Sequence, residues 1–149
     1  MSNVDKETID FKLKSCLQVI GRMYNAESVK NGGNVFGAYF LLNVDSKDGS
    51  YATEVASRMG MKSSSLSRMI KNLENENMIE RKSDKNDKRK VKILLTEAGK
   101  EKKNLAKAFV KSFNQLIEQT IGVKRKEELI KTLEDITLLA ENKLENLKK

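Results

Sequence analysis

A run of short polar side chains at 63–67, SerSerSerLeuSer, is followed by two long cations, Arg68 and Lys71. Serine hydroxyls both donate and accept hydrogen bonds, and Arg and Lys reach phosphates and the O6 and N7 atoms of guanine. The pattern therefore favours recognition of a polyanion through hydrogen bonds. A plainer alternative for Ser63 or Ser64 is that it caps a helix. The residues with this polar character are Lys62, Ser63, Ser64, Ser65, Ser67, Arg68, Lys71 and Asn72.

A second basic cluster follows at 84–90, AspLysAsnAspLysArgLys, and contains Lys85, Lys88, Arg89 and Lys90. Short, partly alternating apolar segments flank it at 79–82 and 91–95, which predicts a β-hairpin with a long charged tip. A charged tip is often only a solvated loop. A basic loop directly after a polar helix is better explained as an arm that reaches the adjacent minor groove of DNA, where A·T tracts concentrate negative potential.

Residue types that most other site chemistry requires are missing. The 149-residue chain has no His, no Pro, no Trp and one Cys, Cys16. These counts exclude Ser-His-Asp and Cys-His catalysis, His-based pH switches, and zinc sites built from thiolates and imidazoles. An enzyme would have to work through carboxylates and lysines, and no acidic pair has a spacing typical of paired acid and base roles. We therefore expect no enzyme, no metal site and no cofactor.

The excess positive charge lies mainly in one segment. The chain holds 29 Lys plus Arg against 21 Asp plus Glu, a net charge of +8. Residues 58–92 carry a net charge of +6, whereas residues 1–57 carry −1 and residues 93–149 carry +3. A solvated lysine-rich surface would explain the excess, but a basic stripe on one segment is also the electrostatic footprint of nucleic-acid binding.

No segment approaches the roughly 18 consecutive apolar residues that a membrane span needs. Residues 1–14 carry charges every few positions and lack the apolar centre of a signal peptide. The sequence thus predicts a cytoplasmic protein with no membrane partner.

The elements that must position these side chains are mainly helical. Apolar residues at spacings of three and four over 9–24 predict an amphipathic helix, which the pair Gly32–Gly33 ends. A buried helix is expected at 35–44. Two long helices with narrow apolar seams follow Thr96, a predicted N-cap, with a break near Gly122. The predicted order is helix, helix, helix-turn-helix, hairpin, helix, helix.

The segment 52–71 has the pattern of a helix-turn-helix. Ala56 supplies the small residue where the two helices cross, and Gly60 supplies a turn residue free to take a positive φ. Met61 is then placed in the gap between the helices. Asn77 is predicted to end the second helix, because asparagine tolerates the left-handed conformation. An ordinary helical corner is the alternative. The apolar stripe of the second helix is Leu66, Met69, Ile70 and Leu73.

Four further motifs follow one another in the segment 51–100: GluValAla at 54–56, AsnLeuGluAsnGluAsnMetIleGluArg at 72–81, Asp84-x-x-Asp87-Lys88-Arg89, and LeuThrGluAlaGly at 95–99. With these motifs the segment resembles the winged helix-turn-helix of the MarR family, the multiple antibiotic resistance regulators. Two departures are Asn77, where the family usually has glycine, and Lys88, where it usually has an arginine with bidentate geometry. The resemblance implies a mainly α fold with a small β-hairpin wing, in which a DNA-binding lobe at about 35–100 is flanked by helical dimerisation regions at 1–30 and 101–149.

This resemblance implies a homodimeric transcriptional regulator, a repressor, that binds a palindromic operator in double-stranded DNA. The polar helix face would enter the major groove, Arg89 would reach the minor groove, and Asp87 would hold the basic residues of the wing. Intramolecular packing is the alternative explanation of the helical seams. The residues expected in the dimer interface are Ile9, Leu13, Leu17, Leu129, Leu133, Ile136, Ala140, Leu144 and Leu147.

Many family members release DNA when a small aromatic or amphipathic molecule binds. The residues that would line such an effector pocket are Met23, Tyr24, Phe36, Tyr39 and Phe40. An aromatic cluster at helical spacing more often forms part of an ordinary hydrophobic core. Some relatives instead sense peroxide through a first-helix cysteine. Cys16 lies on that helix, but Ile20 replaces the sensors' aromatic residue, and apolar neighbours favour an inert buried thiol. A helical interaction module that does not bind DNA remains an alternative, which would require an apolar groove in place of the serine-rich face.

Overall fold

The computed structural model describes residues 4–84, 86–87 and 89–148. The chain forms two compact units, Met1–Lys107 and Ala108–Lys149, and helix α5 (Glu97–Ile121) runs from the first into the second. Across the described residues, no helix is both long enough and apolar enough to cross a membrane.

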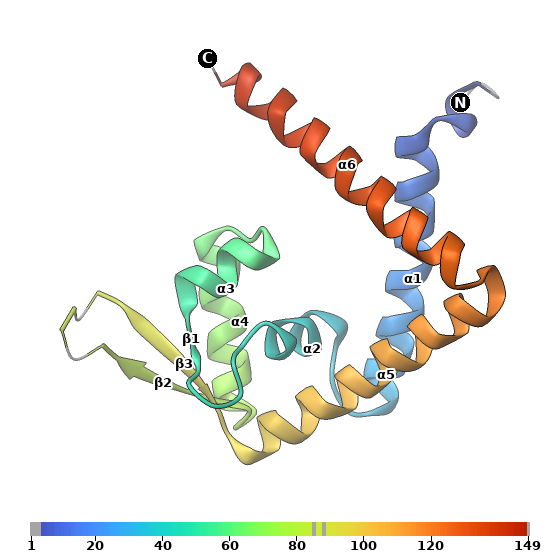
Figure 1. Ribbon diagram of the computed structural model, residues 1–149. Coiled ribbons are helices and arrows are strands. Elements are labelled where there is room, and N and C mark those ends of the chain that lie inside the picture. The colour runs from blue at the N-terminus through green and yellow to red at the C-terminus, as the bar shows by residue number, and fades with distance from the viewer. Residues whose placement is uncertain (1–3, 85, 88, 149) are drawn as a thin grey trace. The chain divides into compact units, whose positions relative to one another are not determined.

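The first unit contains the two predicted N-terminal helices, the helix-turn-helix and the hairpin, and the mainly helical fold with a small wing is confirmed (Figure 1). The short strand β1 was not predicted, because two residues are too few to show a period. In chain order the elements are the 3-10 helix η1 (Val4–Glu7), α1 (Ile9–Lys30), α2 (Val35–Leu42), β1 (Ser50–Tyr51), α3 (Ala52–Met59), α4 (Ser63–Asn75), β2 (Ile79–Ser83), β3 (Val91–Leu95) and the start of α5.

The three strands form one antiparallel sheet in the order β1-β3-β2. Across the hairpin Ile79 is opposite Leu95 and Ser83 is opposite Val91. β1 pairs with the other edge of β3, where Ser50 is opposite Ile93. The segment that precedes the helix-turn-helix is therefore hydrogen-bonded to the wing.

The core of the first unit joins α2, the helix-turn-helix and the sheet. Helix α4 contributes Leu66, Ile70 and Leu73, whose spacing of four and three places them on one face. The polar residues of α4 are thereby turned outward. The other core residues are Phe40, Leu41, Val44, Val55, Ile79, Ile93 and Leu95.

The LeuThrGluAlaGly motif forms the junction between the hairpin and α5. Asn77 takes a φ of 57°, as predicted for the end of α4. The Thr96 hydroxyl donates to the Asn77 carbonyl at 2.7 Å and accepts from the Gly99 N–H at 3.0 Å, which confirms the predicted N-cap. A Cβ at Gly99 would lie 2.0 Å from the carbonyl oxygen of Met78. Only glycine permits this close approach.

Two adjacent lysines of α5 bind the ends of the preceding helices. The Lys102 ammonium donates to the Asn31 carbonyl, just after α1, and the Lys103 ammonium donates to the Val44 carbonyl, just after α2. Lys103 is buried, and this burial lowers its pKa. Cations at helix C-termini interact favourably with the helix dipole.

In the second unit α5 ends at Ile121 and α6 (Val123–Leu147) begins after Gly122, whose φ is 82°. The two helices are linked by an ion pair between Glu118 and Lys126 at 2.7 Å. Neither α6 nor α1 contains a buried residue. Their apolar seams are therefore largely exposed within the single chain.

Candidate nucleic-acid interface

The turn of the helix-turn-helix is formed by Gly60, which takes a left-handed φ of 61° as predicted. The Met61 N–H donates to the Ala56 carbonyl at 3.0 Å and closes the end of α3. Met61 itself is half-buried. This tight turn places the first residues of α4 directly after α3.

Helix α4 presents most of its predicted contact residues to solvent. The N-cap is Lys62, whose side chain makes no capping hydrogen bond. The cap therefore differs from the serine cap considered as an alternative. The side chain of Ser63 lies outside the described part of the structure. The predicted contact residues that are exposed are Lys62, Ser64, Ser65, Ser67, Arg68, Lys71 and Asn72.

A hollow of about 380 Å³ lies between the start of α2 and the length of α4. Ser64, Arg68 and Asn72, at a spacing of four, lie on one stripe of α4 and line the hollow. Phe36 lines it from α2 and is 66% exposed. Ser65 lines the hollow as well, so the structure brings four predicted contacts together on the side of α4 that faces Phe36.

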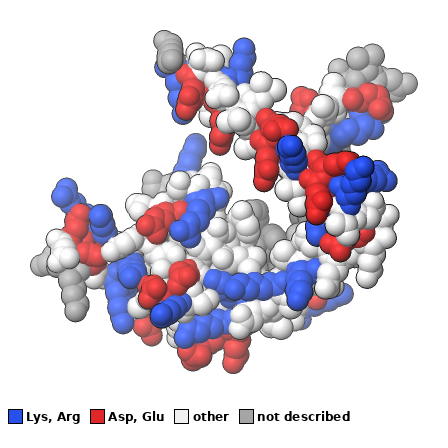
Figure 2. Space-filling model, in the orientation of Figure 1, with Lys and Arg blue, Asp and Glu red and all other residues white. Residues whose placement is uncertain are grey.

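Basic side chains continue from α4 onto the hairpin, and Figure 2 shows them in blue along the wing at the left of the view. Residues 58–92 hold 11 basic and 5 acidic side chains. One acidic group is neutralised locally, because Glu74 of α4 pairs with Arg81 of β2 at 2.5 Å. The surface potential around α4 and the wing is therefore expected to attract polyanions.

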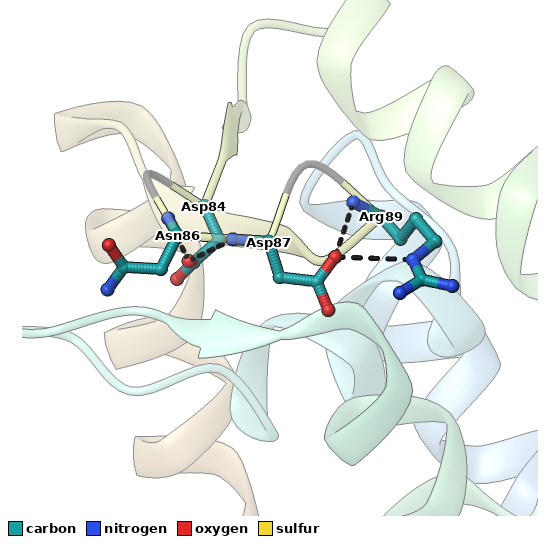
Figure 3. Close-up of polar contacts among 4 residues, drawn as sticks. All are labelled: Asp84, Asn86, Asp87 and Arg89. Atoms are coloured by element: carbon teal, nitrogen blue, oxygen red, sulfur yellow. Dashed lines mark hydrogen bonds and ion pairs between the residues drawn. The ribbon is translucent and has the colours of Figure 1, made fainter.

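The tip of the wing is organised by two aspartates (Figure 3). One oxygen of Asp84, Oδ1, accepts hydrogen bonds from the backbone N–H groups of Asn86 at 2.8 Å and Asp87 at 3.0 Å. Asp87 in turn accepts the backbone N–H of Arg89 at 3.0 Å and its side-chain Nε at 3.4 Å. Asp87 thus contacts the arginine that it was predicted to hold. Lys90 is exposed, and Lys85 and Lys88 lie outside the described residues.

Asp84 and Tyr51 have structural roles that the sequence analysis missed. The Tyr51 hydroxyl donates to Oδ2 of Asp84 at 2.6 Å, across 33 residues of chain. This hydrogen bond, with those from the two backbone N–H groups, lowers the pKa of Asp84 to about 2. The same bond and the carboxylate charge raise the pKa of Tyr51. An aspartate that opens a turn often accepts N–H bonds from the next residues, which was the available signal for Asp84.

The residues predicted for an effector pocket differ in their burial, and they do not all line one hollow. Phe40 is completely buried in the core of the first unit, so it acts there as a packing residue. Phe36 and Tyr39 of α2 are exposed, and Met23 and Tyr24 of α1 are half-buried. Of the five, Phe36 lines the hollow beside α4.

Cys16 is exposed on α1, so the expectation of a buried thiol is wrong for the single chain. The reason is that the apolar stripe around it is itself exposed, as the exposure of Leu17 shows. No group of three or more acidic or thiol side chains that could hold a metal ion occurs in the described ranges.

Comparison with known proteins agrees with this geometry. Residues 40–91 match the model of the MarR family. No curated protein matches the sequence. The fold is similar to that of the transcriptional regulator SlyA, with 18% identity, a TM-score of 0.81, and coverage of 98% of this chain and 99% of that one.

Two further solved structures share the fold. MepR of S. aureus, in a complex with DNA, is 17% identical with a TM-score of 0.80, and the match covers 87% of this chain and 96% of MepR. CouR of Rhodococcus jostii RHA1, bound to p-coumaroyl-CoA, is 23% identical with a TM-score of 0.77, and covers 91% of this chain and 95% of CouR. The match to the MarR family model thus covers the helix-turn-helix and most of the wing, and nearly the whole chain shares the fold of solved transcriptional regulators, one of them a MarR-family protein of Rhodococcus sp. RHA1.

Proposed function

We propose that this protein is a cytoplasmic homodimer that binds a palindromic site in double-stranded DNA and represses transcription until a small molecule releases it. The observation that carries the proposal is the set of exposed donors and cations on α4 and the wing, which includes Arg68 and Arg89. The relative MepR, solved as a DNA complex, supports the same use of the fold. We assign the protein no catalytic activity and no cofactor.

Helix α4 is proposed to lie in the major groove with its serine-rich face toward the bases. Arg68 and Lys71 can reach guanine or phosphate, and the short serines allow close approach. The side chain of the N-cap residue Lys62 makes no hydrogen bond to the first turn of α4, and the N-terminal end of a helix suits a phosphate. Arg89 is proposed to enter the adjacent minor groove, while Lys90 contacts the phosphate backbone.

The dimer is supported by apolar side chains that the single chain leaves in water. Leu17 of α1 is 66% exposed, and Leu144 and Leu147 of α6 are 53% and 73% exposed. On each helix these side chains belong to an apolar seam, and an exposed apolar seam of this kind is typical of an interaction surface. A second copy of the chain would cover both helices and would place two α4 helices about one DNA turn apart.

A small aromatic or amphipathic effector is proposed from the exposed aromatic residues of α2, Phe36 and Tyr39, with Met23 and Tyr24 of α1. The relative CouR was solved with p-coumaroyl-CoA, an aromatic thioester, which supports an effector of this class. Phe40 is left out of the proposed site because it belongs to the core.

A second candidate function, thiol-based sensing, is favoured by the exposure of Cys16. Peroxide should then release DNA from the wild-type protein but not from Cys16→Ser. If both proteins release DNA equally, or neither does, this candidate is eliminated.

A mobility-shift assay on promoter fragments at moderate salt tests the main proposal. The wild-type protein should retard a subset of fragments, and Arg68→Ala should bind them more weakly. A protein that retards no fragment would point instead to an interaction module that does not bind DNA.

A further inference from the structure

We propose that Tyr51 is a positioning residue for the DNA-binding wing, which it fastens to the body of the lobe through Asp84. The inference rests on the proposed function, because it concerns how the wing arginine meets DNA. Tyr51 itself need not touch DNA.

The two carboxylate oxygens of Asp84 accept hydrogen bonds from different parts of the protein, one from the body of the lobe and the other from the wing tip. Oδ2 accepts the Tyr51 hydroxyl at 2.6 Å, and Tyr51 belongs to β1 and directly precedes α3. Oδ1 accepts the N–H groups of Asn86 and Asp87 in the tip. The Asp84 N–H also donates to the Lys90 carbonyl at 3.0 Å and closes the loop. One carboxylate therefore joins the helix-turn-helix to the wing tip.

The bonds continue from Asp84 to Arg89. The Lys90 N–H donates to the Asp87 carbonyl at 2.9 Å, and the Asp87 carboxylate binds Arg89 through its backbone and side chain. The Arg89 side chain is 94% exposed, and its 3.4 Å ion pair with Asp87 is long. An exposed pair of this kind holds a side chain weakly. The direction in which Arg89 leaves the lobe therefore depends on the turn that Asp84 organises.

The hairpin itself provides little stiffness at this end. In β2 only Ile79 is buried, and Glu80–Ser83 are exposed. β1 pairs with β3 at Ile93 and Lys92, so the hairpin is two-stranded only beyond Lys92, toward the tip, and a two-stranded segment is marginally stable by itself. Among the described tip residues, 84, 86–87 and 89–90, the Tyr51 hydroxyl bond is the one side-chain hydrogen bond that reaches the body of the lobe.

The Tyr51 ring adds a second connection to the same strands. The ammonium groups of Lys90 and Lys92 each lie 5.8 Å from the ring centroid, within the range of a cation–π contact. The ring thus groups two wing lysines near the Asp84 carboxylate. Replacement of Tyr51 by Phe would keep this ring and remove only the hydroxyl.

The decisive experiment is a double-mutant cycle on DNA affinity with Tyr51→Phe and Arg89→Ala. We expect Tyr51→Phe to weaken binding about fivefold, in the range of one lost hydrogen bond. In the Arg89→Ala background the same change should have an effect of less than about 1.5-fold, because the positioned group is already gone. Thr120→Val, which removes an exposed hydroxyl that donates to the Leu116 carbonyl in α5, is the control and should leave affinity unchanged.

A spectroscopic readout separates the bond from a general structural effect. The phenolate titration of Tyr51, assigned by its loss in Tyr51→Phe, should shift to lower pH in Asp84→Asn. No shift would mean that the bond is absent in solution, and the inference would fail. The inference would also fail if the Tyr51→Phe protein bound the operator as tightly as the wild type does. It would fail equally if the Tyr51→Phe substitution weakened binding by the same factor in the wild-type and Arg89→Ala backgrounds. A wild-type protein that bound no duplex would refute the proposed function itself.

Discussion

Replacing Arg89 with Ala should flatten the salt dependence of DNA binding. The Arg89 side chain is 94% exposed and makes one long ion pair, so its loss should leave the fold intact. Each DNA phosphate whose charge a Lys or Arg neutralises releases counterions and contributes about 0.9 to the slope of log affinity against log salt. A dimer carries two copies of Arg89, so the slope should become less steep by about 1.8.

This slope change has a measurable size. Between 50 and 200 mM salt, the wild-type protein should lose about 12-fold more affinity than Arg89→Ala. Fluorescence anisotropy with a labelled operator at four or more salt concentrations provides the slope. Arg125→Ala, which removes the same charge from an exposed position in α6, is the control and should retain the wild-type slope.

The result that refutes this reasoning is an Arg89→Ala protein with the affinity and slope of the wild type. Arg89 would then point away from DNA, and the wing assignment would be wrong. Equal flattening by Arg125→Ala would also refute it, because the effect would then come from net charge and not from a wing contact.

Three further predictions concern the fold, the dimer and pH. Gly99→Ala should lower the free energy of unfolding, measured in urea, by about 1–3 kcal/mol, because its Cβ would lie 2.0 Å from the carbonyl oxygen of Met78. Ala106→Gly offers a comparison within the same helix. A decrease for Gly99→Ala of less than about 0.5 kcal/mol would contradict the close approach. Leu133→Asp should reduce the sedimentation mass to the 16.9 kDa monomer and weaken DNA binding, and a variant that remains dimeric would exclude α6 from the interface. The pKa of Asp84 is lowered from 3.8 to about 2 in the folded state, so its contribution to wing order should be present above pH 3.8 and lost as pH falls through about 2. Amide signals of Asn86 and Asp87 in NMR spectra should report this loss, and a titration unchanged by Asp84→Asn would contradict it.

Features governed by local conformation were predictable from the sequence. Gly60 and Asn77 take positive φ values, and Thr96 caps α5, because each position places a strong constraint on residue type. The core stripe of α4 was predictable for the same reason, since its spacing alone selects one helix face.

Features that depend on distant contacts were not predictable. The bond between Tyr51 and Asp84 joins residues 33 positions apart, and β1 is too short to show alternation. Helix α2 is apolar on all sides, so its period could not distinguish buried Phe40 from exposed Phe36. The exposure of Cys16 was not predictable for a related reason. An amphipathic stripe predicts that a helix face is covered, but it does not say whether the covering surface belongs to the same chain.

Selection of bound duplexes from a random pool tests the central claim most directly. The wild-type protein should enrich a palindromic sequence whose half-sites lie about one helical turn apart, 10–10.5 base pairs, or a multiple of that spacing. The enriched duplex should bind two protomers. Enrichment of a single half-site, or no enrichment over the input pool, would contradict the proposal of a dimer that reads DNA through α4 and the wing.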